Sequence, residues 1–199
     1  MIRGARSGIV PSDAHATFFR PLRASRLHPR PRWYDALVSF RPAEKSDEHA
    51  LGRLGAALMR QHHASDPQRF LIVDRPEAGY GRFLVSLIGN PQYRVLVAER
   101  ANEVAGYVLA GIEPTSWKDL RGPCGYIHDL YVHESARRQG VGQELMRAAI
   151  AWIHSRGMSQ VVLMSKSGNQ GAQRLFAKLG FRDTMVEMTL DREASDSKD

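Results

Sequence analysis

The sequence predicts a mixed α/β domain, in which antiparallel and parallel strand pairs share one sheet and helices flank it. Three observations support this fold class. Strand-like and helix-like runs of apolar residues follow one another in the order β-α-α-β-β-β-α-β-α-β. The runs 93–99 and 103–113 are separated by three residues and predict a hairpin. The strand-like run 125–132 leads through a glycine-bearing turn into an amphipathic helix.

The first predicted element is a short strand over 37–43, which Pro42 ends. Ser46 is expected to cap the helix that follows, because its hydroxyl can accept a backbone N–H bond at the helix start. Apolar residues at helical spacing within 50–58 give this helix its buried face. A second short helix is predicted over 81–90.

The second half of the chain alternates between helices and strands. A helix is predicted from Val141, and Gly157 ends it. The apolar run 160–165 predicts a buried strand, and Asn169 is expected to cap the last helix. The alternating run 184–190 predicts a closing strand.

Charge is distributed unevenly along the 199 residues. The net charge is +7, and residues 1–34 carry seven arginines against one acid. We expect a basic, mostly unstructured extension over 1–36, a folded domain over 37–191 and a polar tail over 192–199. The extension could be a flexible arm, an artefact of an upstream start or of cloning, or a targeting segment. Because the folded domain is nearly neutral, no nucleic-acid partner is expected.

Several other classes of protein and site are disfavoured by composition. No apolar run approaches the ~20 residues of a membrane span, so no membrane partner is expected. Cys124 is the only cysteine, which excludes an internal disulfide and fits a reducing, cytoplasmic compartment. His62 and His63 lack a suitably spaced third ligand, so no metal site is expected.

The turn "RRQGVG" at 137–142 is the most informative stretch. A strand that feeds such a turn into a helix leaves several backbone N–H groups unpaired at the positive end of the helix dipole. Gly140 and Gly142 allow close approach of a ligand, and Arg137 and Arg138 add positive charge. The sequence therefore predicts an anion site suited to phosphate.

Two common nucleotide motifs do not fit this turn. A Walker motif needs Gly-Lys-Ser/Thr, but Gln143 and Glu144 follow Gly142. The dinucleotide fingerprint needs a third glycine where Leu145 stands. Phosphate binding here must therefore belong to another type of fold.

The turn resembles the Q/R-x-x-G-x-G/A signature of the GNAT superfamily of acyl-CoA N-acyltransferases. The strand 126–132 precedes it, a helix follows, and "NQGAQRLFAKLGF" at 169–181 is similar to the family's second acyl-CoA segment. The resemblance covers roughly 37–191. It implies a GNAT-type fold, with a mixed sheet splayed at the coenzyme site and flanked by helices.

The resemblance implies acetyl-CoA as cosubstrate and no metal. The pyrophosphate would lie on the backbone amides of the turn, and the pantetheine between the parallel strands. The residues implied in coenzyme binding are Leu130, Tyr131, Val132, Arg137, Arg138, Gln139, Gly140, Val141, Gly142, Gln143, Asn169, Ala172 and Phe176.

The resemblance also implies direct attack of an amine on the thioester, without a covalent enzyme intermediate. A protonated amine must first lose a proton, so a base or a water chain is needed. Strict strand alternation would place His128 with Leu130 on one face and Asp129 with Tyr131 on the other, unless a bulge intervenes. By resemblance to the diamine acetyltransferases, His128 occupies the base position and Asp129 is its neighbour. Either could be the base, Asp129 could instead anchor the amine, or both could be structural.

One departure from the family concerns the acid that protonates the leaving thiolate. Many members carry a tyrosine where this chain has Phe176, and Tyr131 or water could substitute. The acceptor pocket is expected in the irregular segments 62–81 and 113–124, where Trp117 could form a wall and Asp74 could bind a cationic amine.

We therefore predict an acetyl-CoA-dependent N-acetyltransferase that acts on a primary amine of a small molecule or a peptide terminus. The alternative is an acyl-CoA-binding or sensing domain with weak or no catalysis, which the phenylalanine at 176 motivates. A binder of nucleic acid through its arginine-rich arm is a further alternative. A homodimer is common in the family, and the sequence leaves the oligomeric state open.

Overall fold

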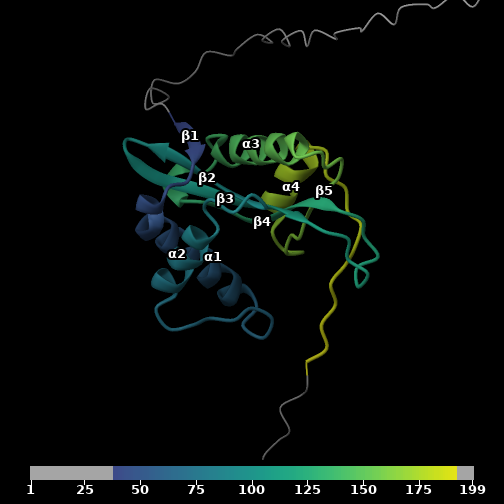
Figure 1. Cartoon of the computed structure of the whole chain (residues 1–199). Helices are drawn as coiled ribbons and strands as arrows, with labels where there is room; N and C mark the ends of the chain where they lie inside the picture. Colours follow the sequence, from purple (N-terminus) through teal and green to yellow (C-terminus); the bar gives the residue numbers. More distant parts are fainter. Residues whose placement is uncertain (1–37, 192–199) are drawn as a thin grey trace, which may run out of the picture. The chain divides into compact units, whose positions relative to one another are not determined.

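The computed structural model describes residues 38–191, which form a five-stranded sheet with helices on both faces (Figure 1). The strands lie in the order β1-β2-β3-β4-β5. The first four pair antiparallel, and β4 and β5 pair parallel. The predicted mixed α/β class is confirmed. The predicted extension over 1–36 and tail over 192–199 lie outside the described residues.

The first elements differ in detail from their predictions. They are β1 (Ser39–Pro42), the 3₁₀ turn η2 (Lys45–Asp47), α1 (Glu48–Ser65) and α2 (Pro76–Ser86). Ser46 lies inside η2 and does not cap α1. Glu44 and Asp47 instead form a capping box around η2. Helix α2 starts five residues before the predicted 81, because Pro76 has the backbone geometry of a first helical residue.

The hairpin prediction is confirmed by β2 (Tyr93–Arg100) and β3 (Glu103–Glu113). The two turn residues, Ala101 and Asn102, both have left-handed φ angles, 49° and 63°. Two left-handed residues match the twist of the paired strands. Strand β4 (Cys124–Val132) then pairs with β3.

The remaining elements are η3 (Glu134–Ala136), α3 (Val141–Ser155), β5 (Val161–Leu163) and α4 (Gln170–Lys178). Asn169 caps α4 as predicted, since its Oδ1 accepts the N–H of Ala172 at 3.1 Å. Gly157 has a φ of 82° just after α3. Strand β5 is shorter than the predicted 160–165.

The predicted closing strand over 184–190 is not formed. Its apolar side chains are 83–98% exposed, namely Met185, Val186, Met188 and Leu190. A strand needs a backbone partner, and β5, at one edge of the sheet, offers only three residues. The alternating pattern predicted a strand from local sequence alone, but no strand of the sheet pairs with this segment. Glu187 instead contacts Arg69 through a salt bridge.

Two cores cover the two faces of the sheet. On one face α3 buries Leu145, Met146 and Ile153 against the strands. On the other face α1 and α2 bury Leu51 and Leu84. Figure 1 shows α3 on one side of the sheet and α1 and α2 on the opposite side. Within 38–191, no helix combines the length and the apolar character needed to cross a membrane.

Candidate active site

A bulge in β4 positions the two residues predicted to act on the amine. Asp129 pairs with Leu109 and Ile127 pairs with the next residue of β3, Ala110. His128 is therefore an extra residue in β4 with no counterpart in β3. A bulge of this kind shifts the alternation of side chains by one position.

The bulge corrects the predicted arrangement of faces. Ile127 and Leu130 pack with the core under α3, whereas Tyr131 belongs to the core under α1 and α2. Asp129 contacts Tyr80 and Tyr107 of that second face, and His128 contacts Tyr93 of the same face. His128 and Asp129 therefore lie on the same face of the sheet, although they are adjacent in sequence.

Asp129 is held by two phenols. Tyr80 Oη and Tyr107 Oη both donate to its Oδ2, at 2.6 and 3.1 Å. Burial raises the pKa of the Asp129 carboxyl, and the two phenol bonds and the nearby His128 and His62 act in the opposite direction. Burial and the same carboxylate raise the pKa values of both phenols, so they remain donors.

The second oxygen of Asp129, Oδ1, is not engaged by the two tyrosines. Oδ1 has no hydrogen bond among the described residues, and no buried side-chain N or O atom within them lacks a partner. Oδ1 is therefore accessible to solvent. A fixed carboxylate with one accessible oxygen is suited to bind an ammonium group or to take a proton from it.

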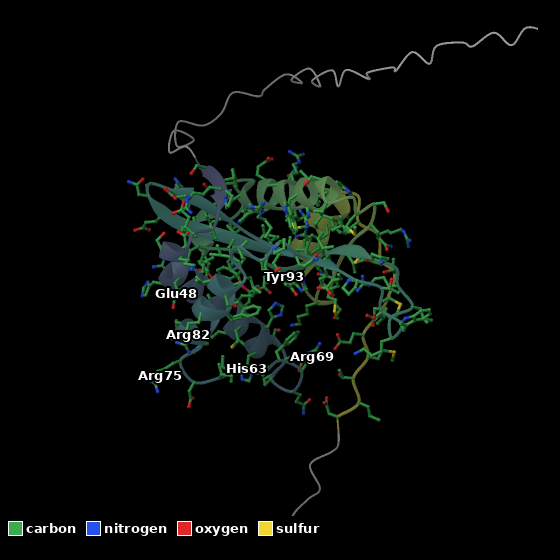
Figure 2. The ribbon with its side chains drawn as sticks, viewed as in Figure 1. Glu48, His63, Arg69, Arg75, Arg82 and Tyr93 are labelled. Carbon is green, nitrogen blue, oxygen red and sulfur yellow. The ribbon has the colours of Figure 1, made fainter. Side chains whose placement is uncertain are left out.

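His128 is more exposed than Asp129, with 31% of its side-chain surface accessible. Its Nε2 lies 3.2 Å from Oε1 of Glu113, the last residue of β3. Its ring lies between two tyrosine rings, with centroids 4.8 Å from Tyr126 and 6.0 Å from Tyr93. Figure 2 labels Tyr93 near the sheet and His63 and Arg69 near the loop that follows α1.

The predicted acceptor loops contribute unequally. A hollow of ≈ 400 Å³ is lined by residues that include Tyr93, Glu113 and Pro123. Trp117 is 86% exposed on the loop before β4, and Asp74 is exposed in the loop before α2. From the predicted segment 113–124, the structure brings Glu113 to His128. The roles of Trp117 and Asp74 stay predictions.

The turn before α3 has the backbone of an anion site. Arg138 and Gly140 have left-handed φ angles of 59° and 83°. Gly140 is the N-cap of α3 and no side chain caps the helix. In the first hydrogen bond of the helix, the N–H of Glu144 donates to the carbonyl of Gly140. The N–H groups of Val141, Gly142 and Gln143 therefore have no helical partner.

Two side chains of the turn bond to neighbouring parts of the chain. The Arg137 Nε donates to the carbonyl of Val132 at 2.8 Å, and its guanidinium lies 5.3 Å from the Tyr131 ring centroid. The Gln139 amide donates to the carbonyl of Ser135 and its oxygen accepts from Arg100. These two side chains hold the turn in place, and Arg138 is left exposed.

The sheet splits next to the turn. Strand β5 ends at Leu163, opposite Ile127, so the rest of this edge of β4 has no partner strand within 38–191. The N–H of His133 bonds to β3, and alternation therefore directs the backbone groups of Leu130 and Val132 to the open edge. Arg137 already occupies the Val132 carbonyl.

The second predicted coenzyme segment lies at α4. The Asn169 side chain and the Ala172 N–H are bonded to each other, so neither is free to bind through those atoms. Phe176 is half-buried against the core under α3, and its ring is 6.0 Å from that of Phe181. Tyr131 is buried on the opposite face of the sheet.

Sequence reasoning missed Tyr80, Tyr107 and Gly111 as parts of the site. Tyr107 and Gly111 lie in a strand whose apolar pattern suggested only a core, and Tyr80 lies in the predicted acceptor segment 62–81 but was not singled out there. A glycine inside a strand often marks a close approach of another group, and this signal could have identified Gly111. The phenols gave no signal, because their partner is distant in sequence. Residues 38–191 contain no group of three His, Cys, Asp or Glu side chains that could hold a metal.

Comparison with known proteins agrees with the fold. The model of the Acetyltransferase (GNAT) family matches residues 56–181. An L-methionine sulfoximine/L-methionine sulfone acetyltransferase of Pseudomonas aeruginosa is 34% identical over 45% of this chain and 51% of its own. A thialysine N-epsilon-acetyltransferase of Bos taurus is 28% identical over 74% of this chain and 86% of its own.

A solved structure shares the fold. The aminoglycoside N-acetyltransferase AAC(6')-Iy in complex with CoA has a TM-score of 0.60 and 17% identity, over 84% of this chain and 100% of its own. The chain belongs to the GNAT family of acetyltransferases. It spans about a third to a half of the length of several relatives, 32% of a mycothiol acetyltransferase and 51% of the Pseudomonas protein.

Proposed function

We propose that this protein is an acetyl-CoA-dependent N-acetyltransferase that transfers an acetyl group to the primary amine of a small molecule or of a peptide terminus. The observation that carries the proposal is the bulge at His128. It sets a fixed carboxylate and an imidazole on one face of β4, beside the end of β5. Relatives named for thialysine, mycothiol and aminoglycoside acetylation support an amine as acceptor.

In the proposed reaction each group has a separate role. The unpaired amides of 141–143 bind the coenzyme pyrophosphate, and the open edge of β4 at Leu130 binds the pantetheine. Asp129 Oδ1 binds the acceptor ammonium, and His128 takes its proton. The free amine attacks the thioester carbonyl, the C–S bond breaks, and the coenzyme leaves as a thiolate. The second N–H proton, which the nitrogen loses as the amide forms, passes to this thiolate, and because a thiol has a pKa of about 8.5 the leaving group needs no strong acid.

The experiment is a steady-state assay with acetyl-CoA against thialysine, methionine sulfone, an aminoglycoside, a diamine and a peptide N-terminus. We expect turnover with at least one cationic amine. Asp129→Asn should raise KM for that amine, and His128→Gln should lower kcat about 10²- to 10⁴-fold, the usual contribution of a general base. Absence of turnover with all the amines would contradict the proposal.

A second candidate is an acyl-CoA-binding domain with weak catalysis. The specific observation in its favour concerns the acid that would protonate the thiolate. Phe176 has no hydroxyl group, and Tyr131 is buried on the opposite face of the sheet, so it cannot protonate a thiolate at α4. Tight coenzyme binding by calorimetry together with no turnover would support this candidate.

A further inference from the structure

Residues on one face of β3 contact the two predicted site residues of β4, His128 and Asp129. Tyr107 donates to Asp129 at 3.1 Å, and Glu113 pairs with His128 at 3.2 Å. Gly111 lies between them on the same face, since it is two residues before Glu113. These three positions of β3 therefore face His128 and Asp129.

Gly111 makes room for the imidazole. Tyr93, Gly111 and Tyr126 stand side by side on β2, β3 and β4. A Cβ at position 111 would lie 2.8 Å from His128 Nε2 and 3.0 Å from the Tyr93 ring. Because Gly111 has no side chain, it leaves a slot between Tyr93 and Tyr126. The imidazole of His128 lies in this slot, with Nε2 above Gly111.

We propose that Glu113, together with the slot at Gly111, is the positioning device that selects the working tautomer of His128. The contact is an ion-pair distance and is not among the side-chain hydrogen bonds of residues 38–191, but a carboxylate next to Nε2 favours the tautomer with the proton on that nitrogen. The lone pair then resides on Nδ1, the ring nitrogen that does not face Glu113.

This inference rests on the proposed function for its chemical consequence. The N–H bond of the acceptor ammonium breaks, its electron pair stays on nitrogen, and the proton binds Nδ1. The resulting imidazolium carries a positive charge 3.2 Å from Glu113, which stabilises it. The His128 proton later passes to solvent, and the second N–H proton, which the nitrogen loses as the amide forms, passes to the coenzyme thiolate. Glu113 touches neither substrate nor coenzyme in this scheme, so it is a positioning residue.

The direct test is nitrogen-15 NMR of the histidine side chains at a pH where His128 is neutral, with His128→Gln used for assignment. We expect the Nε2–H tautomer in the wild-type protein and a mixture of tautomers in Glu113→Gln. Glu103→Gln is the matched control, because Glu103 is an exposed acid at the other end of β3. An Nδ1–H tautomer in the wild type, or the same tautomer ratio in Glu113→Gln, would overturn the inference.

A kinetic measurement separates this inference from the proposed function. With an accepted amine, Glu113→Gln should lower kcat about 10- to 100-fold, part of the 10²–10⁴-fold effect of a general base, and leave KM for acetyl-CoA unchanged. Glu113→Asp should recover part of kcat. Unchanged kcat in Glu113→Gln would refute the positioning role in a working enzyme. If the wild type has no turnover, the proposed function fails, and the tautomer measurement still decides the position of the proton.

Gly111→Ala tests the slot itself. The added Cβ would move Nε2 away from Glu113, so the same tautomer mixture is expected in a folded protein. Because the methyl group could also disturb folding, the circular dichroism spectrum is compared with that of Glu113→Gln. A folded Gly111→Ala protein that keeps the Nε2–H tautomer would show that the slot is not needed.

Discussion

The two glycines of the turn should respond differently to alanine, since the substitution should destabilise the protein at Gly140 but not at Gly142. Gly140 has φ 83° and ψ −7°, close to the third residue of a type II turn, which requires glycine or asparagine. An alanine in this left-handed conformation costs about 1–2 kcal/mol. Alanine also reduces the conformational entropy of the unfolded chain, which stabilises the folded protein by about 0.4–1 kcal/mol. Gly140→Ala should therefore lower the free energy of unfolding by about 1 kcal/mol.

Gly142 provides the matched control. It lies in the first turn of α3, and a Cβ would meet Leu175 and Val132 at 3.5 and 3.6 Å, which is ordinary contact. Alanine is the better helix former by about 0.5–1 kcal/mol, so Gly142→Ala should be neutral or stabilising. Denaturant unfolding measures both variants, and Gly140→Asn should lose less than Gly140→Ala.

Gly140→Ala should also weaken the binding of coenzyme A. If Gly140→Ala turns one backbone N–H away from a phosphate, the loss is about 1.5–3 kcal/mol, since hydrogen bonds to charged groups contribute that much. This equals a rise in Kd for coenzyme A of about 10- to 150-fold, measured by calorimetry. The reasoning is refuted if Gly140→Ala is as stable as the wild type, or if both alanine variants lose equal stability.

Three further predictions concern ionisable groups. Burial raises the pKa of Asp129 in the folded state, so the protein loses stability as pH rises from the pKa of the unfolded chain through the pKa of the folded protein. Asp129→Asn should therefore raise Tm at pH 8, and this rise in Tm should vanish below about pH 3.9, where the carboxyl is protonated in both states. The pKa of Asp47 is lowered, chiefly by hydrogen bonds from Arg41, so Asp47→Asn should cost about 1.5–3 kcal/mol at pH 7, and denaturant unfolding should show the difference fading as pH falls through the folded pKa. Tyr80→Phe removes a donor that lowers the pKa of Asp129, so the acid limb of the kcat/KM profile should move to higher pH; an unmoved limb would exclude Asp129 as the amine anchor.

The sequence by itself determined the fold class, the hairpin, the cap of α4 and the turn at 137–142. These features depend on local physics: apolar period, left-handed turn residues and a side chain that bonds its own helix. The same local reasoning failed for 184–190. Strand propensity is local, whereas a strand forms only where another backbone supplies its hydrogen bonds.

Only the tertiary structure decided how the site is arranged. Strict alternation separated His128 from Asp129, and the bulge, which exists only in the pairing of β4 with β3, placed them on one face. The partners of these residues, Tyr80, Tyr107 and Glu113, come from α2 and β3 and lie 15 to 49 positions away in sequence. Their contacts depend on strand register and helix packing, which no local pattern encodes.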